Sequence, residues 1–148
     1  MALFQAFNIS ASGMTAERFR TDIIAENIAN VNTTSTESGG PYRRKLVNFA
    51  ERKVTPFSQY YVTASQNPAI GNGVKVTSVK EDTETDFVKE YDPSNPDADA
   101  DGYVSYPNVN TVTEMTNLID STRAYEANAT AFDATKSMAT TGLSIGKQ

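Results

Sequence analysis

The sequence has 148 residues, with 13 basic and 18 acidic side chains, a formal net charge of −5, and neither Cys nor His. Without thiols and imidazoles the chain lacks the ligands of most zinc sites, a Cys nucleophile and a His-based acid/base pair. This composition argues against most enzyme classes. We therefore expect no enzymatic activity, no catalytic residue, no metal site and no cofactor.

The basic side chains form only one short cluster, Arg43, Arg44 and Lys45. Nucleic-acid binding needs a broad basic face, so we expect no nucleic-acid partner and place these three charges on a solvated strand edge. Residues 1–14 lack both a basic n-region and a long apolar stretch, as found in signal peptides and membrane spans. We expect no membrane insertion, and either a cytoplasmic protein or one exported without a cleaved signal.

Residues 3–32 show the first regular pattern, a helical one. Positions spaced by alternating steps of three and four residues carry Leu3, Phe7, Met14, Thr21, Ile24, Ile28 and Val31, with Ser10 and Glu17 or Arg18 as polar interruptions. The pattern ends in a run of short polar side chains at 30–34, which compete for the backbone, and Gly39, Gly40 and Pro41 follow. The sequence predicts one long N-terminal helix.

Between residues 41 and 107 the period changes to two. Four short runs rich in Val, Phe and Tyr, bounded by Asn, Gly, Asp and Pro, predict strands at 43–49, 73–80, 87–91 and 102–106. Four strands of this length make a small sheet at best. Residues 55–72 have no sustained period, and we interpret them as a loop.

An EF-hand-like spacing lies just before the fourth predicted strand. Asp97, Asp99, Asp101 and Gly102 match the first half of a calcium-binding loop, but Asn108 stands where the bidentate Glu is required. No entering helix is predicted. We favour an acidic turn over a cation site.

From residue 110 the helical period returns. Thr111 and Glu114 have the spacing of a capping box, which predicts a helix start here. The helix should run to about residue 141, with a seam that continues over four heptads. The seam residues are Met115, Leu118, Thr122, Tyr125, Ala129, Phe132, Lys136, Ala139 and Leu143.

These elements predict an α+β fold in which long N- and C-terminal helices pair as an α-helical coiled coil around a small β-rich middle segment. The expected boundaries are 1–33, 34–107 and 108–148. Leu, Ile, Val and Phe make up just under a fifth of the chain, which is little core material. Both helices are also longer than a domain of this size is wide. We infer that they associate with neighbouring subunits.

Two stretches carry a family resemblance. The segment from Glu26 to Thr33 (ENIANVNT) resembles the signature that ends the first helix of bacterial flagellar rod and hook proteins. Residues 102–115 and 123–128 (RAYEAN) resemble the same superfamily. Residues 40–45, 91–93 and 96–99 are similar to the FlgC family of basal-body rod proteins. The matching motif residues are Asn27, Ala29, Asn30, Asn32, Thr33, Arg123, Tyr125, Glu126 and Asn128.

The resemblance implies a structural subunit of the proximal rod, which crosses the periplasm and transmits torque. It implies copies of itself and other rod proteins as partners, export by the flagellar type III apparatus, and terminal helices that order on assembly. The alternative is a soluble coiled-coil adaptor or calcium-dependent binding module. We expect an assembly interface formed by Leu3, Phe7, Met14, Ile24, Ile28, Val31, Met115, Leu118, Tyr125, Ala129, Phe132 and Leu143.

Overall fold

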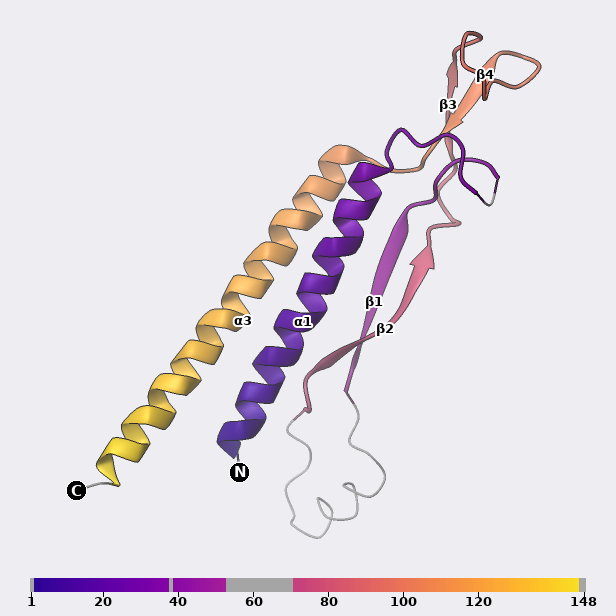
Figure 1. The fold of residues 1–148 in the computed structure, drawn as a ribbon. Helices are drawn as coiled ribbons and strands as arrows, with labels where there is room; N and C mark the ends of the chain where they lie inside the picture. The colour runs from indigo at the N-terminus through magenta and orange to yellow at the C-terminus, as the bar shows by residue number, and fades with distance from the viewer. Residues whose placement is uncertain (1, 38, 53–70, 147–148) are drawn as a thin grey trace. The chain divides into compact units, whose positions relative to one another are not determined.

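The computed structural model describes residues 2–37, 39–52 and 71–146 (Figure 1). The chain has an α+β fold, with a long helix at each end and short strands between them, as the sequence predicts. Most of the predicted loop at 55–72 lies outside the described residues. The elements are α1 (Ala2–Ala29), β1 (Lys45–Glu51), β2 (Val74–Glu81), β3 (Val88–Tyr91), β4 (Tyr103–Tyr106) and α3 (Thr111–Ile145).

The four predicted strands are present within two residues of their expected bounds, but they form two sheets instead of one. β1 pairs with β2, and β3 pairs antiparallel with β4 in a register that places Val88 opposite Tyr106 and Tyr91 opposite Tyr103. The break follows β2, where the Asp82 carboxylate accepts hydrogen bonds from the backbone N–H groups of Glu84 and Thr85. This side-chain-capped turn ends the ladder before β3 begins.

The start of α3 corrects the predicted capping box. Asn110, not Thr111, is the N-cap, because its Oδ1 accepts from the backbone N–H groups of Val112 at 3.0 Å and Thr113 at 3.2 Å. Glu114 does not reach back to the helix start. Its side chain is 1% exposed and contacts other segments instead.

The described chain divides into two compact units. Unit 1 comprises Met1–Phe19, Phe49–Thr77 and Ser121–Gln148; unit 2 comprises Arg20–Asn48 and Ser78–Asp120. Each long helix therefore contributes one part to each unit.

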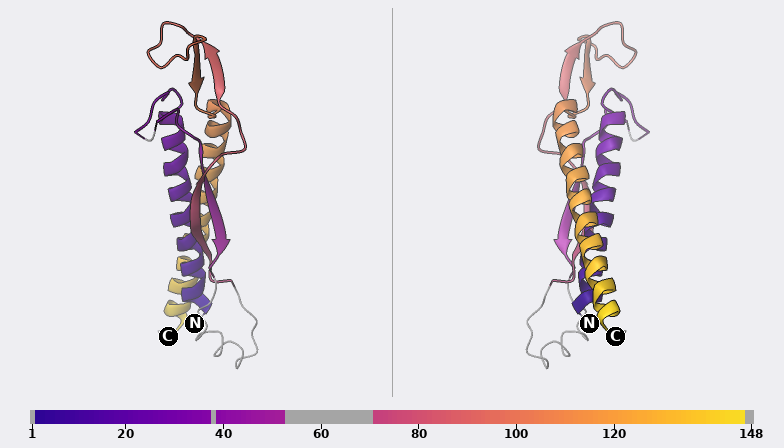
Figure 2. Two further views of the ribbon diagram at one scale, coloured as in Figure 1. Left: turned by 90° about the vertical axis from the view of Figure 1, so that its right-hand side faces the viewer. Right: turned by 90° about the vertical axis from the view of Figure 1, so that its left-hand side faces the viewer.

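In unit 1, α1 and α3 run antiparallel and side by side, and β2 lies along another side of α1 (Figures 1 and 2). The backbone N–H of Val74 in β2 donates to the Ser12 hydroxyl at 3.1 Å. Among the residues of this unit that the structure describes, the buried ones are small: Ser10, Ala16, Ser121 and Thr135. Small side chains allow the helix backbones to approach closely, but they remove little apolar surface from water.

Unit 2 contains the larger buried side chains. Ile24 from α1, Tyr42 before β1 and Val104 in β4 are its buried apolar groups. Three polar side chains are buried with them: Asn27, Asn108 and Glu114. The centre of this unit is therefore a mixed apolar and polar core, in which each polar group needs a partner.

Candidate assembly elements

The signature residue Asn27 lies at the centre of a buried hydrogen-bond network in unit 2. Its Nδ2 donates to the Lys45 carbonyl at 2.9 Å and to Glu114 Oε2 at 3.1 Å. Its Oδ1 accepts from the Tyr42 hydroxyl and the Lys45 backbone N–H, both at 2.9 Å. All four hydrogen-bonding positions of the amide are used. Asn27 thereby joins the last turn of α1 to β1 and to the first turn of α3.

Glu114 extends this network to Arg44. The Arg44 Nε and Nη2 donate to Glu114 Oε1 at 2.9 and 2.5 Å, so the guanidinium contacts one carboxylate oxygen and Asn27 the other. This overturns the expected position of Arg44 on a solvated strand edge. The physical reason is that a carboxylate as buried as Glu114 requires a charged partner.

Asn108 binds the backbone of Arg44. Its Oδ1 accepts from the Arg44 backbone N–H at 2.9 Å, and its Nδ2 donates to the carbonyls of Asp82 and Thr85 at 3.0 and 3.1 Å. Arg44 Nη1 also lies 3.8 Å from Asp82 Oδ2. The residue that fails the calcium-loop pattern is thus a structural residue that joins the segment before α3 to the residue before β1 and to the turn after β2.

Two titratable groups of unit 2 have shifted pKa values. Burial raises the pKa of Tyr42 to about 12, and the nearby carboxylates of Glu26, Glu114 and Glu81 add to the increase. The backbone N–H of Thr85, followed by further hydrogen bonds and the Arg44 charge, lowers the pKa of Asp82 below its usual value. Tyr42 therefore stays protonated and donates to Asn27.

Two further residues of the N-terminal signature, Asn30 and Thr33, form the end of α1. The Asn30 Nδ2 donates to the Glu26 carbonyl at 2.9 Å, and the Thr33 hydroxyl donates to Asn30 Oδ1 at 3.1 Å. The Thr33 carbonyl accepts from the Tyr42 backbone N–H at 3.1 Å. These bonds turn the chain from the end of α1 back toward Tyr42.

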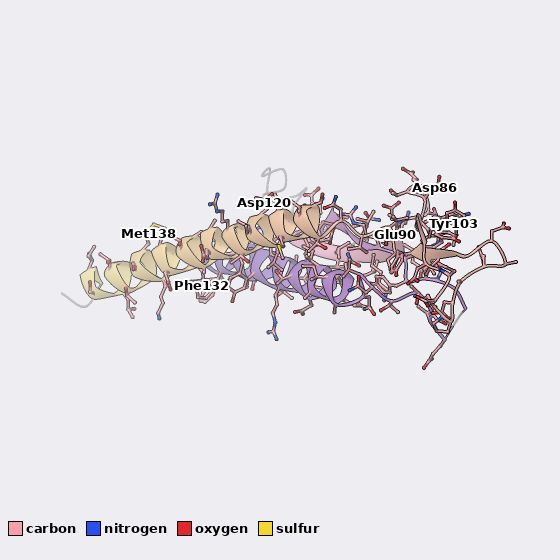
Figure 3. The ribbon with its side chains drawn as sticks, turned by 90° about the horizontal axis from the view of Figure 1, so that it is seen from above. Asp86, Glu90, Tyr103, Asp120, Phe132 and Met138 are labelled. Atoms are coloured by element: carbon pink, nitrogen blue, oxygen red, sulfur yellow. The ribbon has the colours of Figure 1, made fainter. Side chains whose placement is uncertain are left out.

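An aromatic pair, a close approach and a hydrogen bond join the two helices of unit 1. The rings of Phe7 and Phe132 contact edge to face with centroids 4.8 Å apart. Between Gly13 and Asn128 the fit is tight, because a Cβ at Gly13 would lie 2.7 Å from Asn128 Oδ1. The Ser121 hydroxyl donates to the Glu17 carbonyl at 2.9 Å. Figure 3 shows Phe132 on the side of α3 toward α1 and Met138 on the opposite side.

The buried positions of α3 differ from the predicted seam. Glu114, Ser121 and Thr135 are buried, each one residue before the seam positions Met115, Thr122 and Lys136, which are exposed. The pairing face is selected by close approach of small and polar side chains, not by apolar size. Of the larger apolar seam residues, Phe132 and Leu118 are half-buried, whereas Met115, Tyr125 and Leu143 are exposed, so the apolar period only partly follows the pairing face.

The predicted interface residues divide by exposure, and the side chain of Leu3 lies outside the described part. Ile24 is buried; Phe7, Met14, Ile28, Val31, Leu118, Ala129 and Phe132 are half-buried; Met115, Tyr125 and Leu143 are exposed. Of the signature residues, Asn27 is buried; Asn30, Thr33 and Asn128 are half-buried; Ala29, Asn32, Arg123, Tyr125 and Glu126 are exposed.

Sequence reasoning missed the structural roles of Arg44, Asn108 and Gly13, and it placed Glu114 in a capping box instead of a buried network. The only available signal was Gly13, a helix-breaking residue inside a predicted helix, which often marks a close packing contact. Asn108, Arg44 and Glu114 come together only through tertiary structure, since Arg44 and Glu114 are 70 residues apart in sequence.

The acidic stretch before β4 forms a turn. The Asp99 carbonyl accepts from the Gly102 N–H at 2.8 Å, the Asp97 carboxylate accepts from the Thr34 hydroxyl at 2.7 Å, and Gly102 has a φ of 80°.

No group of three or more His, Cys, Asp or Glu side chains that could hold a metal ion is found among the described residues. Within the same residues, no helix combines the length and the apolar character needed to cross a membrane.

Comparison with known proteins identifies the family. Residues 7–35 match the model of the flagella basal body rod proteins, and residues 100–145 match that of the flagellar basal body rod FlgEFG protein C-terminal region. The flagellar basal-body rod protein FlgC of Bacillus subtilis is 44% identical over 99% of this chain and all of its own length. FlgC of Borreliella burgdorferi is 43% identical over 98% of both chains, and FlgC of Salmonella typhimurium is 38% identical over 99% of this chain and all of its own. The chain belongs to the FlgC family of flagellar basal-body rod proteins.

Proposed function

We propose that this structural subunit of the flagellar basal-body rod polymerises through the outward faces of α1 and α3. Its full-length relatives are named basal-body rod proteins, so the chain is a structural protein and not an enzyme. The finer proposal concerns which surfaces assemble. It rests on the side chains that the two helices leave exposed.

One observation carries this proposal. In unit 2, Val112, Met115 and Ile119 are 74%, 52% and 53% exposed, and their spacing of three and four residues places them on one face of α3. We call these three residues the α3 stripe. Burying a large apolar side chain contributes about 1.5–3 kcal/mol. Covering the stripe with a neighbouring subunit would therefore favour assembly.

Unit 1 supports the same proposal independently. Met138, Leu143 and Ile145 are exposed on α3, although each is large and apolar. Apart from the Phe7–Phe132 pair, the described face between the helices is built from small residues, so the unit gains little from its internal packing. We infer that α1 and α3 complete a coiled-coil arrangement within the rod, where neighbouring helices cover the outward apolar groups.

This assembly would be heterologous and helical, because a rod grows through different surfaces on successive subunits. The terminal helices would line the axial tube and the β-rich segments would face outward. Partners would be further copies of this chain and other rod proteins, delivered by the flagellar type III export apparatus. The finished rod would cross the periplasm and transmit torque through many shallow contacts.

A charge placed on the α3 stripe tests the proposal. We expect Met115→Asp to abolish incorporation into basal bodies and swimming in a flagellated host that lacks its own copy of the protein. Thr113→Asp is the matched control, because Thr113 is also exposed, lies two residues away on the same helix, and receives the same charge. The measurements are immunoblots of purified basal bodies and swimming diameter in soft agar. Normal incorporation of Met115→Asp would show that the stripe makes no assembly contact.

A further inference from the structure

The β3–β4 hairpin of unit 2 exposes one face of its two-stranded sheet. In an antiparallel pair, residues directly opposite each other share a face, and successive residues alternate between faces. The register therefore places Lys89, Tyr91, Tyr103 and Ser105 together, and we call these four residues the hairpin face. Val104, on the other face, is fully buried, whereas Tyr91 and Tyr103 are 67% and 46% exposed. The hairpin face thus leaves two aromatic rings uncovered.

The backbone and the neighbouring ring hold Tyr91 in place. The rings of Tyr91 and Tyr103 contact edge to face with centroids 5.4 Å apart. A Cβ at Gly102 would lie 2.9 Å from Tyr91 Cε2, so the ring can take this position only over a glycine. An aromatic surface that is already ordered loses little conformational entropy when a partner covers it.

The negative charge of the chain is concentrated around this face. Residues 84–106 contain seven acidic side chains and one basic side chain, Lys89, so they contribute −6 to the formal total of −5, and the rest of the chain contributes +1. None of these seven carboxylates forms an ion pair with a described Lys or Arg side chain. Figure 3 shows two of them, Asp86 and Glu90, at the hairpin, where Tyr103 also lies. The potential around the hairpin face is therefore negative.

The edge of β3 adds backbone groups to this surface. Within the described part of the chain, β3 pairs only with β4. The Asp92 N–H donates to the Gly102 carbonyl at 3.0 Å, so the alternation of an antiparallel ladder turns the N–H and C=O groups of Tyr91 and Lys89 away from β4. An extended segment of another chain can pair with such an edge and place its side chains over the adjoining face.

A second copy of this chain does not match the charge of the hairpin face. The one run of three basic residues is already engaged within unit 2: Arg44 and Lys45 pair with the carboxylates of Glu114 and Glu26, and Arg43 lies over an aromatic ring. No other part of the sequence has three adjacent basic residues. We therefore assign the complementary positive charge to a different protein.

We propose that the hairpin face and the β3 edge bind an extended basic segment of another protein, with Lys or Arg side chains over the two tyrosine rings. Cations bind over aromatic rings, and the Arg43 guanidinium makes this contact within the chain, 4.2 Å from the Phe87 centroid. A neutral glycan would gain nothing from the negative charge, and an anionic surface would be repelled. The proposal does not depend on polymerisation through α1 and α3.

Fluorescence anisotropy with the full chain, diluted until light scattering reports a monomer, tests the docking. The probe is a labelled eight-residue peptide that alternates Arg and Thr. We expect saturable binding that weakens as salt rises from about 0.05 to 0.5 M, because salt screens exposed charges. The same peptide with Glu in place of Arg should not bind. No binding of the basic peptide, or equal binding of both peptides, would overturn the proposal.

Charge variants locate the site. Asp86→Asn combined with Glu90→Gln removes two exposed charges at the hairpin, and we expect binding to weaken at least about three-fold. The matched control, Asp120→Asn with Glu126→Gln, removes the same two charges from exposed positions of α3 and should leave the affinity unchanged. An equal loss in both double variants would show that the peptide responds to net charge alone, which refutes the hairpin as the site.

Ring variants test the aromatic contact. Tyr91→Ala should weaken binding about three- to five-fold, whereas Tyr91→Phe keeps the aromatic face and should bind as the original chain does. Tyr125→Ala removes an exposed tyrosine from α3 and is the control that should change nothing. If Tyr91→Ala binds as well as Tyr125→Ala, the rings take no part and the proposed docking is wrong.

Competition distinguishes a protein segment from other ligands. Spermine carries as many positive charges as the peptide but has no backbone to pair with β3, so displacement should need at least about 10-fold more spermine than unlabelled peptide. Cellohexaose should not displace the probe. Displacement by spermine at the peptide's own concentration would assign a small-cation site, and displacement by cellohexaose a carbohydrate site. Either result would overturn the proposal.

Discussion

Replacing Gly13 by Ala should weaken the helix pair of unit 1 even though it improves α1 as an isolated helix. Ala is more favourable than Gly inside a helix by about 1 kcal/mol. Against this, a Cβ at Gly13 would lie 2.7 Å from Asn128 Oδ1 and 2.9 Å from its Cγ. These distances are well below the roughly 3.5–4.0 Å of favourable contact between carbon atoms. The gain in helix propensity stabilises α1 by itself, whereas the clash destabilises the pairing of α1 with α3.

The size of the clash follows from what Asn128 must give up to avoid it. Its Nδ2 donates to the Ala124 carbonyl at 2.8 Å, so rotating the amide away breaks a hydrogen bond worth about 1 kcal/mol. Overpacking a tight contact costs about 1–3 kcal/mol. After subtracting the gain in helix propensity, we expect the pairing of α1 with α3 to be about 1 kcal/mol less favourable. This corresponds to about a five-fold decrease in the equilibrium constant for pairing.

Two measurements separate these effects. Far-UV circular dichroism of the free chain should show equal or higher helicity for Gly13→Ala, whereas incorporation into basal bodies at limiting expression should fall about five-fold. The double variant Gly13→Ala with Asn128→Ala removes the obstructing amide and should recover most of the incorporation. The reasoning is refuted if Gly13→Ala incorporates as well as the original chain, or if the double variant is no better than the single one.

Two further predictions concern unit 2. Because the pKa of Tyr42 is about 12 in the folded chain and about 10 when unfolded, the unfolded chain ionises first as pH rises. The free energy of unfolding should therefore fall by up to about 1.4 kcal/mol per pH unit between pH 10 and 12, whereas below pH 10 the stabilisation from this group is fully present and does not change with pH. Tyr42→Phe should remove this contribution in urea titrations at several pH values, and an identical pH slope in both chains would contradict it. Asn110→Ala should lower the unfolding free energy by about 1 kcal/mol because it removes the N-cap of α3. Thr111→Ala should have little effect, and the reverse order would restore the capping-box interpretation.

The elements were predictable from sequence because each has a strong local period. Both long helices and all four strands lie within a few residues of their expected bounds, since hydrophobic periodicity and turn residues act over short distances. The first turn of α3 was harder. Asn110 and Thr111 both have side chains suited to an N-cap, and only the structure distinguishes the residue that receives the backbone N–H groups.

The network of unit 2 was not predictable in the same way. Charged residues are almost never fully buried unless paired, so the sequence favours exposure for both Arg44 and Glu114. Their contact depends on how the segment before β1 returns from the end of α1, which no local pattern specifies. Asn27 could be singled out by family resemblance, but its four hydrogen-bond partners could not.

The two signature segments meet different physical requirements. Asn27, Asn30 and Thr33 bond within their own unit, so they account for the end of α1 and the return of the chain to Tyr42. In the C-terminal signature, Asn128 fits against Gly13, whereas Arg123, Tyr125 and Glu126 are exposed. The chain's own fold uses the first segment and leaves most of the second outward.

This asymmetry also explains why the apolar seam of α3 did not predict its buried face. If neighbouring subunits cover α3, as we propose, its apolar period follows the completed assembly and not the single subunit. Small and polar groups such as Gly13 and Ser121 then make the close contacts within the subunit. The buried carboxylate of Glu114 binds Arg44 and so joins α3 to the segment before β1. A subunit built in this way keeps its apolar groups available for neighbours without losing a defined fold of its own.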